Sequence, residues 1–305
     1  MPIHVSPRCL SRRNFLVAST ATTASLALSY RSSANENSHP NRFALLSDTH
    51  IPSTPDVIAR GVNMTENLRA VVAELCKLSP QPAAVIINGD CAYLKGLPDD
   101  YANLAECVAP LSQAGLDLHL TMGNHDDRGP LYDALADQRP DSPPVESKHV
   151  TVIESPHANL FLLDSLRQVD VVTGELGEEQ LAWLATELDA RADKPAVIIA
   201  HHNPQFQAPP AGQPWGGLRD TDSFFDLITR RKQVKAFVFG HTHDWSTTRK
   251  ADLHLINLPP VAYVFADDKP NGWVLATLAA DGIELELRTH DTTDRRHGQK
   301  WSLDW

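Results

Sequence analysis

The chain has 305 residues, of which 42% are hydrophobic and 21% are charged. This length and composition suit one large α/β domain with a sizeable core, and they exclude both a disordered chain and a polytopic membrane protein. The formal net charge of −11 argues against a polyanionic partner, so we expect no nucleic acid to bind.

Residues 1–34 are expected to stand apart from the fold. Residues 11–16 read Ser-Arg-Arg-Asn-Phe-Leu, a mildly apolar stretch follows over residues 17–28, and small residues occupy positions 32–34. This pattern resembles a bacterial twin-arginine (Tat) signal peptide, although an ordinary basic tail is the alternative interpretation. We therefore expect recognition by the Tat export machinery and a periplasmic protein, either cleaved after Ala34 or anchored to the membrane by an uncleaved signal. Residues 1–34 hold four arginines and no acid, so residues 35–305 carry a formal charge of −15.

Residues 35–42 are polar and predict a linker, after which strand-like and helix-like runs alternate. Apolar runs typical of strands cover residues 43–48, 83–90, 116–124, 150–153, 159–164, 196–201 and 234–240. Helical spacing of apolar residues predicts helices near residues 68–78, 99–114, 181–188 and 223–230. Residues 203–220 are rich in Pro, Gly and Gln and lack periodicity, which predicts a long functional loop.

The character of the sequence changes after residue 243. Residues 253–258, 261–265, 273–278 and 283–287 predict consecutive strands, and a turn containing Asp281-Gly282 joins the last two. An early alternation of strands and helices followed by strand-rich sequence indicates an α/β fold in which two sheets pack together with helices outside.

Five short polar motifs each follow a predicted strand. They are Asp48-Thr49-His50, Gly89-Asp90, Gly123-Asn124-His125-Asp126, His201-His202 and Gly240-His241-Thr242-His243. Functional sites in open α/β sheets gather at the carboxyl ends of strands, so these motifs could converge on one crevice. Imidazole and carboxylate groups bind Zn, Fe, Mn or Co, and Asp90 is the natural carboxylate to bridge two ions. Two such ions about 4 Å apart can clamp a phosphoryl group and make hydroxide available near neutral pH.

Three of the motifs have a simpler interpretation when taken alone. Asp48 could cap backbone amides in a turn, the third motif could be a polar turn, and the last could be two solvated histidines. Five motifs in this order favour a dinuclear site. For Asp126 the residues leave two roles open, which are orienting His125 and capping the next turn.

The five motifs resemble the DxH, GD, GNH, H and GHxH motifs of the calcineurin-like metallophosphoesterase superfamily, over residues 43–243. The resemblance implies a four-layer αββα sandwich of two mixed β-sheets flanked by helices, formed by residues 35–305. It also implies a phosphoric ester hydrolase with two divalent or trivalent ions of Fe, Mn, Zn or Co, in which a metal-bound hydroxide attacks the ester. One metal would be held by Asp48, His50, Asp90 and His243, and the other by Asp90, Asn124, His201 and His241. His125, with Asp126, would serve catalysis near the leaving group, and His202 would support a ligand or contact the substrate.

One motif departs from the DxH pattern. Gly89-Asp90-Cys91-Ala92-Tyr93 resembles the GDxxY motif of purple acid phosphatases, in which the tyrosine binds iron and the first motif lacks its histidine. Because His50 is present here, Tyr93 has no obvious vacancy on a metal. We expect Tyr93 to pack against its neighbours or to contact the substrate.

The expected substrate is a small phosphate ester, and a phosphodiester is favoured. The DxH-type relatives of this size include cyclic-nucleotide and glycerophosphodiester phosphodiesterases. The negative net charge does not oppose such a substrate, because bound metal ions dominate the local field. A phosphomonoesterase of the acid-phosphatase type is one alternative, and a non-catalytic metal-binding or interaction module is another. The sequence leaves the natural substrate, the metal identity and the oligomeric state open.

Overall fold

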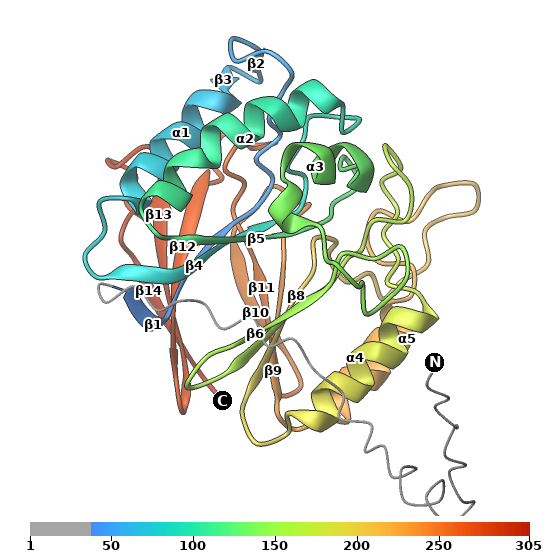
Figure 1. Cartoon of the computed structure of the whole chain (residues 1–305). Helices are drawn as coiled ribbons and strands as arrows, with labels where there is room; N and C mark the ends of the chain where they lie inside the picture. The colour runs from blue at the N-terminus through green and yellow to red at the C-terminus, as the bar shows by residue number, and fades with distance from the viewer. Residues whose placement is uncertain (1–37) are drawn as a thin grey trace, which may run out of the picture. The chain divides into compact units, whose positions relative to one another are not determined.

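The computed structural model describes residues 38–305, which form two six-stranded mixed sheets packed face to face with helices on both outer sides (Figure 1). The four-layer αββα sandwich expected from the sequence is therefore confirmed. The predicted signal peptide, residues 1–34, lies outside the described residues.

The first sheet is built around the N-terminal strand. Its strand order is β14 (Lys300–Asp304), β13 (Gly282–Thr289), β12 (Gly272–Ala279), β1 (Ser38–Leu46), β4 (Gln81–Asn88) and β5 (Asp117–Thr121). Strands β1, β4 and β5 run parallel, whereas β12, β13 and β14 are joined to them in antiparallel pairs. Helices α1 (Met64–Leu75) and α2 (Pro98–Gln113) cover the outer face of this sheet (Figure 1). Helix α1 packs there through Leu68, Val71, Val72 and Leu75, whose helical spacing makes one apolar face.

The second sheet comes mainly from the middle of the chain. Its strand order is β10 (Ser246–Lys250), β11 (Leu253–Asn257), β9 (Val234–Phe239), β8 (Ala196–Ile199), β7 (Asn159–Leu162) and β6 (Thr151–Glu154). Strands β11, β9, β8 and β7 are parallel to one another. Helices α4 (Glu178–Ala190) and α5 (Thr221–Thr229) cover its outer face (Figure 1).

The central strands are buried on both faces, which explains their almost continuous apolar sequence. Along β1, Phe43 and Leu45 point into the core between the sheets, whereas Ala44 and Leu46 point towards α1 and α2. This alternation follows from the two-residue period of a strand. Polar side chains are therefore confined to the strand ends, where all five motifs lie.

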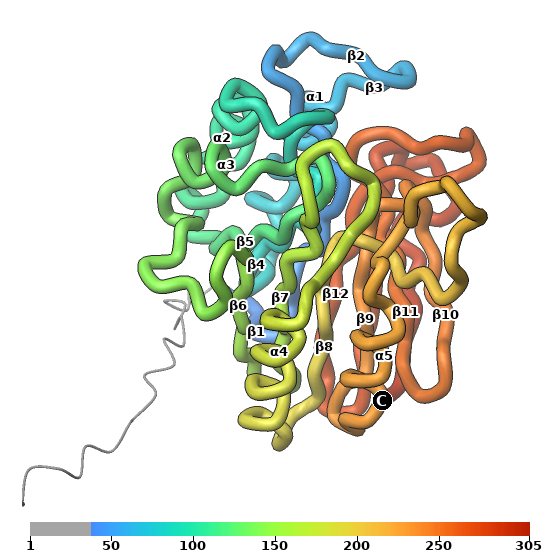
Figure 2. The backbone as a smooth tube through the Cα atoms, turned by 90° about the vertical axis from the view of Figure 1, so that its right-hand side faces the viewer, coloured from blue at the N-terminus to red at the C-terminus, as the bar shows by residue number. Residues whose placement is uncertain are grey.

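Smaller elements decorate the sandwich. Strands β2 (Ile58–Ala59) and β3 (Val62–Asn63) form a hairpin directly before α1, and the hairpin projects at the upper end of the domain (Figure 2). Helix α3 (Arg128–Ala134) and the short helix η1 (Ala136–Gln138) follow the third motif. Within residues 38–305, every helix is too short or too polar to cross a membrane.

Two expectations about secondary structure were wrong. Residues 38–42, predicted as linker, belong to β1, where Ser38 and His39 pair with the start of β4. Residues 261–265, predicted as a strand, form a loop across the carboxyl end of β1, since the amides of Val261 and Ala262 donate to Ser47 and Asp48. Within this loop Val261, Ala262 and Tyr263 are buried without strand pairing, whereas Phe265 is exposed. The sequence also did not predict the edge strands β10 and β14 or helix α3.

Candidate metal centre

All five motifs lie at one edge of the sandwich, where the carboxyl ends of β1, β4, β5, β8 and β9 meet. Direct hydrogen bonds join the two sheets there. The side chain of Asn88, at the end of β4, donates to the carbonyl of Ala200, and His201 Nδ1 lies 2.8 Å from the carbonyl of Asn88. Residues that are far apart in the sequence are thereby held within one cluster.

The backbone is strained at most of the candidate ligands. Five of them have φ angles in the left-handed region, between 46° and 68°, and these are Asp48, His50, Asp90, His241 and His243. Few non-glycine residues adopt this conformation, which costs of the order of 1–3 kcal/mol at each position. Such strain persists where the surrounding structure imposes it, and here it turns each side chain from its strand end into the cluster.

Two glycines allow the motifs to approach one another closely. A Cβ atom added to Gly123 would lie 2.2 Å from Asp90 Oδ1, and one added to Gly240 would lie 1.9 Å from Ser47 Oγ. A larger residue at either position would displace a neighbouring motif.

The side chains form three overlapping groups, each able to hold a metal ion. The groups are Asp48 with His50 and His243, His50 with Asp90 and His125, and Asp90 with His201 and His241. Within each group the ligand atoms lie within 4.8 Å of one another. Asp90 Oδ2 lies 3.8 Å from His50 Nε2 and 3.2 Å from His201 Nε2, so this carboxylate lies between ligands of the two expected ions, as a bridging carboxylate must.

Hydrogen bonds behind the imidazole rings set which nitrogen faces the cluster. His243 Nδ1 lies 2.6 Å from the carbonyl of Tyr263, and His201 Nδ1 is held in the same way by Asn88. Each Nδ1 therefore donates, and in the neutral ring each Nε2 is left as the lone-pair nitrogen. These Nε2 atoms lie 3.4 Å from Asp48 Oδ1 and 3.2 Å from Asp90 Oδ2, respectively. His241 is turned the other way, because its Nε2 faces the carbonyl of Gly216 at 2.9 Å.

The donor set fits a pair of transition-metal ions. Asp48 Oδ1, Asn124 Oδ1 and His201 Nε2 are buried and lack a hydrogen-bond partner. An unsatisfied buried polar atom costs about 1–3 kcal/mol, and a cation coordinated by these atoms would remove that cost. Mixed imidazole and carboxylate ligands suit Zn, Fe, Mn or Co.

The electrostatics of the cluster prepare it for cations. Burial alone would raise the pKa of Asp90, but His201 holds that pKa well below its usual range. Burial lowers the pKa of His201, and the carboxylates of Asp90 and Asp48 outweigh this effect and raise it to about 10. Burial lowers the pKa of His50 to about 3, so this ring is neutral near pH 7. A metal that binds here therefore meets an ionised Asp90 and displaces a proton from His201.

His125 lies at the rim of the cluster, with its side chain 21% exposed. Its amide donates to Asp90 Oδ1 at 2.9 Å, and its Nδ1 lies 2.5 Å from the carbonyl of Leu94. The bond to Leu94 leaves Nε2 available to a ligand of the protein.

The carboxylate of Asp126 binds the second motif and its own motif, whereas Asp127 caps the next turn. Its buried carboxylate accepts hydrogen bonds from the amides of Cys91, Ala92 and Gly123 and from the hydroxyl of Tyr101. Among the described residues, no contact joins this carboxylate to the ring of His125. Asp126 thus ties the second motif to the third, and the orienting role considered from the sequence is not supported by the geometry.

His202 and Tyr93 lie behind the cluster. His202 is fully buried, with its Nδ1 2.7 Å from Ser165 Oγ and its ring 4.6 Å from that of His241. This places His202 as a support for His241, away from solvent. Tyr93 packs against the small apolar cluster that contains Met64, Ala262 and Tyr263.

None of the five motifs contains the further residues that complete the site. Ser165 holds His202, Gly174 packs against the His202 ring, and Gly216 holds His241. Tyr263 stacks on His50 with ring centroids 5.3 Å apart, and Phe265 stacks on His243 at 4.2 Å. The sequence held a signal for Ser165, which directly follows the predicted strand over residues 159–164, and for Gly216, which lies in the predicted functional loop.

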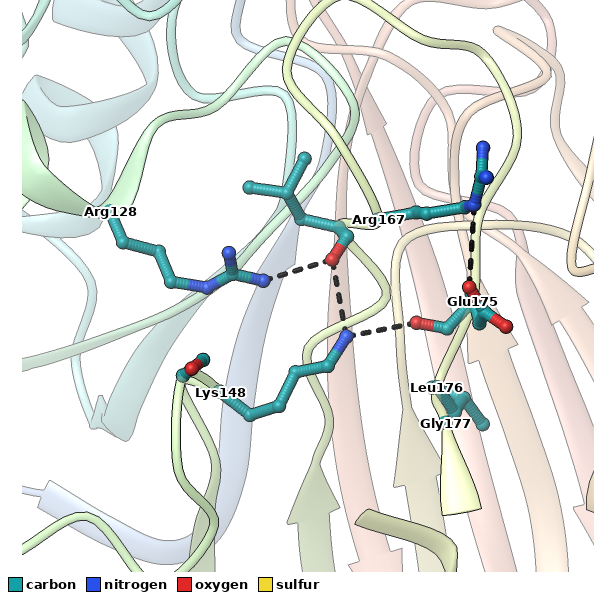
Figure 3. Close-up of a pocket in the computed structure, with 8 residues that line it drawn as sticks. Arg128, Lys148, Arg167, Glu175, Leu176 and Gly177 are labelled. Atoms are coloured by element: carbon teal, nitrogen blue, oxygen red, sulfur yellow. Dashed lines mark hydrogen bonds and ion pairs between the residues drawn. The ribbon is translucent and has the colours of Figure 1, made fainter. Parts of the chain in front are cut away.

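A cavity of about 240 Å³ lies beside the segment between Ser165 and Gly177, and Arg128 and Lys148 line it (Figure 3). Lys148 Nζ donates to the carbonyls of Asp164, Leu166 and Glu175. Arg128 forms a two-point bond with the carboxylate of Asp164. Because these two cations are already satisfied by the protein, they brace the loop and do not form an anion site.

Comparisons with known proteins agree with this geometry. The family model of calcineurin-like phosphoesterases matches residues 41–245. A 3′,5′-cyclic-nucleotide phosphodiesterase of Nostoc sp. is 27% identical over 80% of this chain and 90% of its own length. A probable cyclic nucleotide phosphodiesterase of Rhodococcus erythropolis is 31% identical over 70% of this chain and 68% of its own length. A solved dimetal phosphatase from Danio rerio shares the fold, with a TM-score of 0.64 and 16% identity over 87% of this chain and 98% of its own.

Proposed function

The chain belongs to the calcineurin-like phosphoesterase family, and from this premise we propose that it hydrolyses small phosphodiesters, with 3′,5′-cyclic nucleotides as the substrate class. The observation that carries the proposal is the position of Asp90 between His50 and His201, which are assigned to different ions, in a chain that carries all five motifs. The names of the Nostoc and Rhodococcus relatives support the choice of a cyclic phosphodiester.

We assign the ligands by combining the geometry with the family pattern. One ion would be held by Asp48, His50, Asp90 and His243, and the other by Asp90, Asn124, His201 and His241. When bound, two ions of Fe, Mn, Zn or Co supply Lewis acidity and activate water near neutral pH. Asp48 Oδ2 accepts hydrogen bonds from Ser47 Oγ and the amide of His241, which keeps Oδ1 directed into the cluster.

His125 is proposed to assist the leaving group. The carbonyl of Leu94 accepts from Nδ1–H, so a ring protonated at both nitrogens can donate from Nε2 to the departing oxygen. When the ring of a 3′,5′-cyclic phosphate opens, the departing ribose oxygen is an alkoxide, which needs a proton or a strong hydrogen bond. A positioned imidazole typically contributes about 10²–10⁴ in rate.

Export and domain organisation belong to the same proposal. The Arg12-Arg13 pattern supports a Tat signal over residues 1–34, followed by the phosphoesterase domain over residues 35–305. The protein would then act in the periplasm, free or held by its signal. Tat systems export folded proteins, so the metals could be loaded before export.

A substrate panel tests the proposed activity. The purified protein is loaded in turn with Mn, Zn, Fe and Co, and kcat/KM is measured for cyclic nucleotides, linear diesters and phosphomonoesters. We expect the highest kcat/KM for a cyclic diester. A higher value for monoesters would make the protein a phosphomonoesterase. Bound metal without turnover of any ester would indicate a non-catalytic module.

A further inference from the structure

An exposed aromatic ring lies against the candidate metal centre. Phe265 stacks on the ring of His243, with centroids 4.2 Å apart and planes inclined by 22°, yet Phe265 stays 55% exposed. Its neighbour Tyr263 is buried and stacks on His50. An exposed aromatic ring at the border of a substrate site offers an apolar face to a ligand.

A cation lies over the same ring. The guanidinium carbon of Arg60 is 4.8 Å from the centroid of Phe265 and 5.8 Å from that of Tyr263. Within residues 38–305, the Arg60 guanidinium has these ring contacts but neither a hydrogen bond nor an ion pair with another side chain or carbonyl. Its N–H donors are therefore available to a ligand.

The backbone of Arg60 is strained at its position in the β2–β3 hairpin. Arg60 and Gly61 form the two-residue turn of the β2–β3 hairpin, with φ angles of 50° and 78°. Positive φ at both positions is typical of a type I′ turn, which strongly prefers Asn-Gly, Asp-Gly or Gly-Gly. An arginine is costly at the first position, so a role for its side chain explains its presence better than turn formation does.

We propose that Arg60 and Phe265 form a subsite for the nucleobase of the substrate. This inference rests on the proposed phosphodiesterase function and names the part of the substrate that the metals do not bind. The exposed guanidinium of Arg60 can stack on an aromatic base or donate its N–H groups to base acceptors, and the exposed Phe265 ring adds an apolar contact beside it. The stack that runs from His243 through Phe265 to Arg60 sets this subsite beside the metals, where a base linked to the scissile phosphate through one sugar would lie.

A second exposed cation and ring provide a matched control. Lys250 Nζ lies 4.0 Å from the ring of Phe206, which is 41% exposed. Among the described residues, the ring of Phe206 contacts Phe225 and Lys250 but no candidate ligand. Loss of Lys250 should therefore leave the recognition of the base unchanged.

The experiment compares two substrates that differ only in the base. We would measure kcat and KM for 3′,5′-cyclic AMP and for ribose 3′,5′-cyclic phosphate without a base. The variants are Arg60→Asn, Phe265→Leu and Lys250→Asn, each in the full metal-loaded protein. Arg60→Asn creates the preferred Asn-Gly turn, so the hairpin should fold at least as well, and thermal unfolding would verify this.

The expected result is a change in preference. Arg60→Asn should reduce the ratio of kcat/KM between cyclic AMP and the base-free diester about tenfold, mainly through KM for cyclic AMP, as a lost cation–π contact predicts. Phe265→Leu should reduce the ratio in the same direction, and Lys250→Asn should not change it. An unchanged ratio in Arg60→Asn would overturn the subsite, and so would an equal loss on both substrates, which would place Arg60 on the phosphate.

The wild-type protein distinguishes failure of the subsite from failure of the proposed function. If it hydrolyses both diesters with equal kcat/KM, only the subsite is refuted. If it hydrolyses neither, the proposed function fails and the subsite fails with it.

Discussion

Oδ2 of Asp90 lies 3.2 Å from Nε2 of His201, which brings together the end of a strand in one sheet and the end of a strand in the other. Both side chains are buried. Because the two sheets meet at this pair, a ligand bound between Asp90 and His201 would also fasten the two halves of the sandwich together. Several predictions about metal content and stability depend on this relationship.

Replacing Asp90 by Asn should greatly reduce both metal content and turnover. An amide is a poor bridge between two cations and lacks the negative charge that two dications need. Metal per chain would be measured beside kcat, with the exposed Asp252→Asn as control. A variant that keeps two metals per chain and the wild-type rate would remove Asp90 from the bridging position.

Replacing His125 by Ala should affect substrates according to their leaving groups. Loss of a proton donor should slow alkyl esters by about 10²–10⁴, and should slow nitrophenyl esters less because nitrophenolate departs without a proton. His241→Ala should instead lower metal content and slow both ester classes. Equal slowing of both classes by His125→Ala, or loss of metal from that variant, would contradict the proton-donor role.

Replacing Gly123 by Ala should disturb the site without removing a functional group. The added Cβ would lie 2.2 Å from Asp90 Oδ1 and 2.4 Å from the amide nitrogen of Asp90, so the second motif must shift. We expect a loss of about 1–3 kcal/mol in the free energy of unfolding together with weaker metal binding. Gly129→Ala is the control, because its Cβ would meet only Asp127 at an ordinary 3.5 Å. Unchanged stability and metal content in Gly123→Ala would show that the close approach is dispensable.

Replacing Asp126 by Ala should lower stability before it alters chemistry. Three amides and the Tyr101 hydroxyl would lose a buried acceptor, and each unsatisfied donor costs about 1–3 kcal/mol. Tyr101→Phe removes only one of these bonds and should cost less. Urea unfolding measures both variants. If Asp126→Ala unfolds like the wild type but is slow in turnover, Asp126 orients His125 after all.

Replacing Arg12 and Arg13 together by Lys should block export, because the arginine pair is the feature that the Tat machinery recognises. A C-terminal tag followed through cell fractionation would report the location of the protein. Lys77→Arg, a change of similar size on the surface of the folded domain, serves as the control. Periplasmic delivery that continues in the double variant would refute the Tat signal.

Much of the site could be predicted from the sequence because its parts are local. An apolar run that ends in Asp48-Thr49-His50 or in Gly89-Asp90 predicts both a buried strand and a polar group at the end of that strand. Parallel strands of one sheet end at the same edge, so the convergence of such ends follows from the α/β pattern. The residue types then restrict the chemistry to metals that accept nitrogen and oxygen ligands.

Only the tertiary structure decided what surrounds those motifs. Asp126 follows His125 directly, yet its carboxylate points to amides after β4, a choice that depends on how two loops pack. Phe265 lies in an apolar stretch that predicted a strand, because apolar composition alone does not distinguish a strand from a loop packed on a core. Its stacking on His243 and its contact with Arg60 join three segments that share no local pattern. Residue types and local periodicity were thus determined by the sequence alone, whereas the partners of each side chain were set by long-range packing, which no single segment encodes.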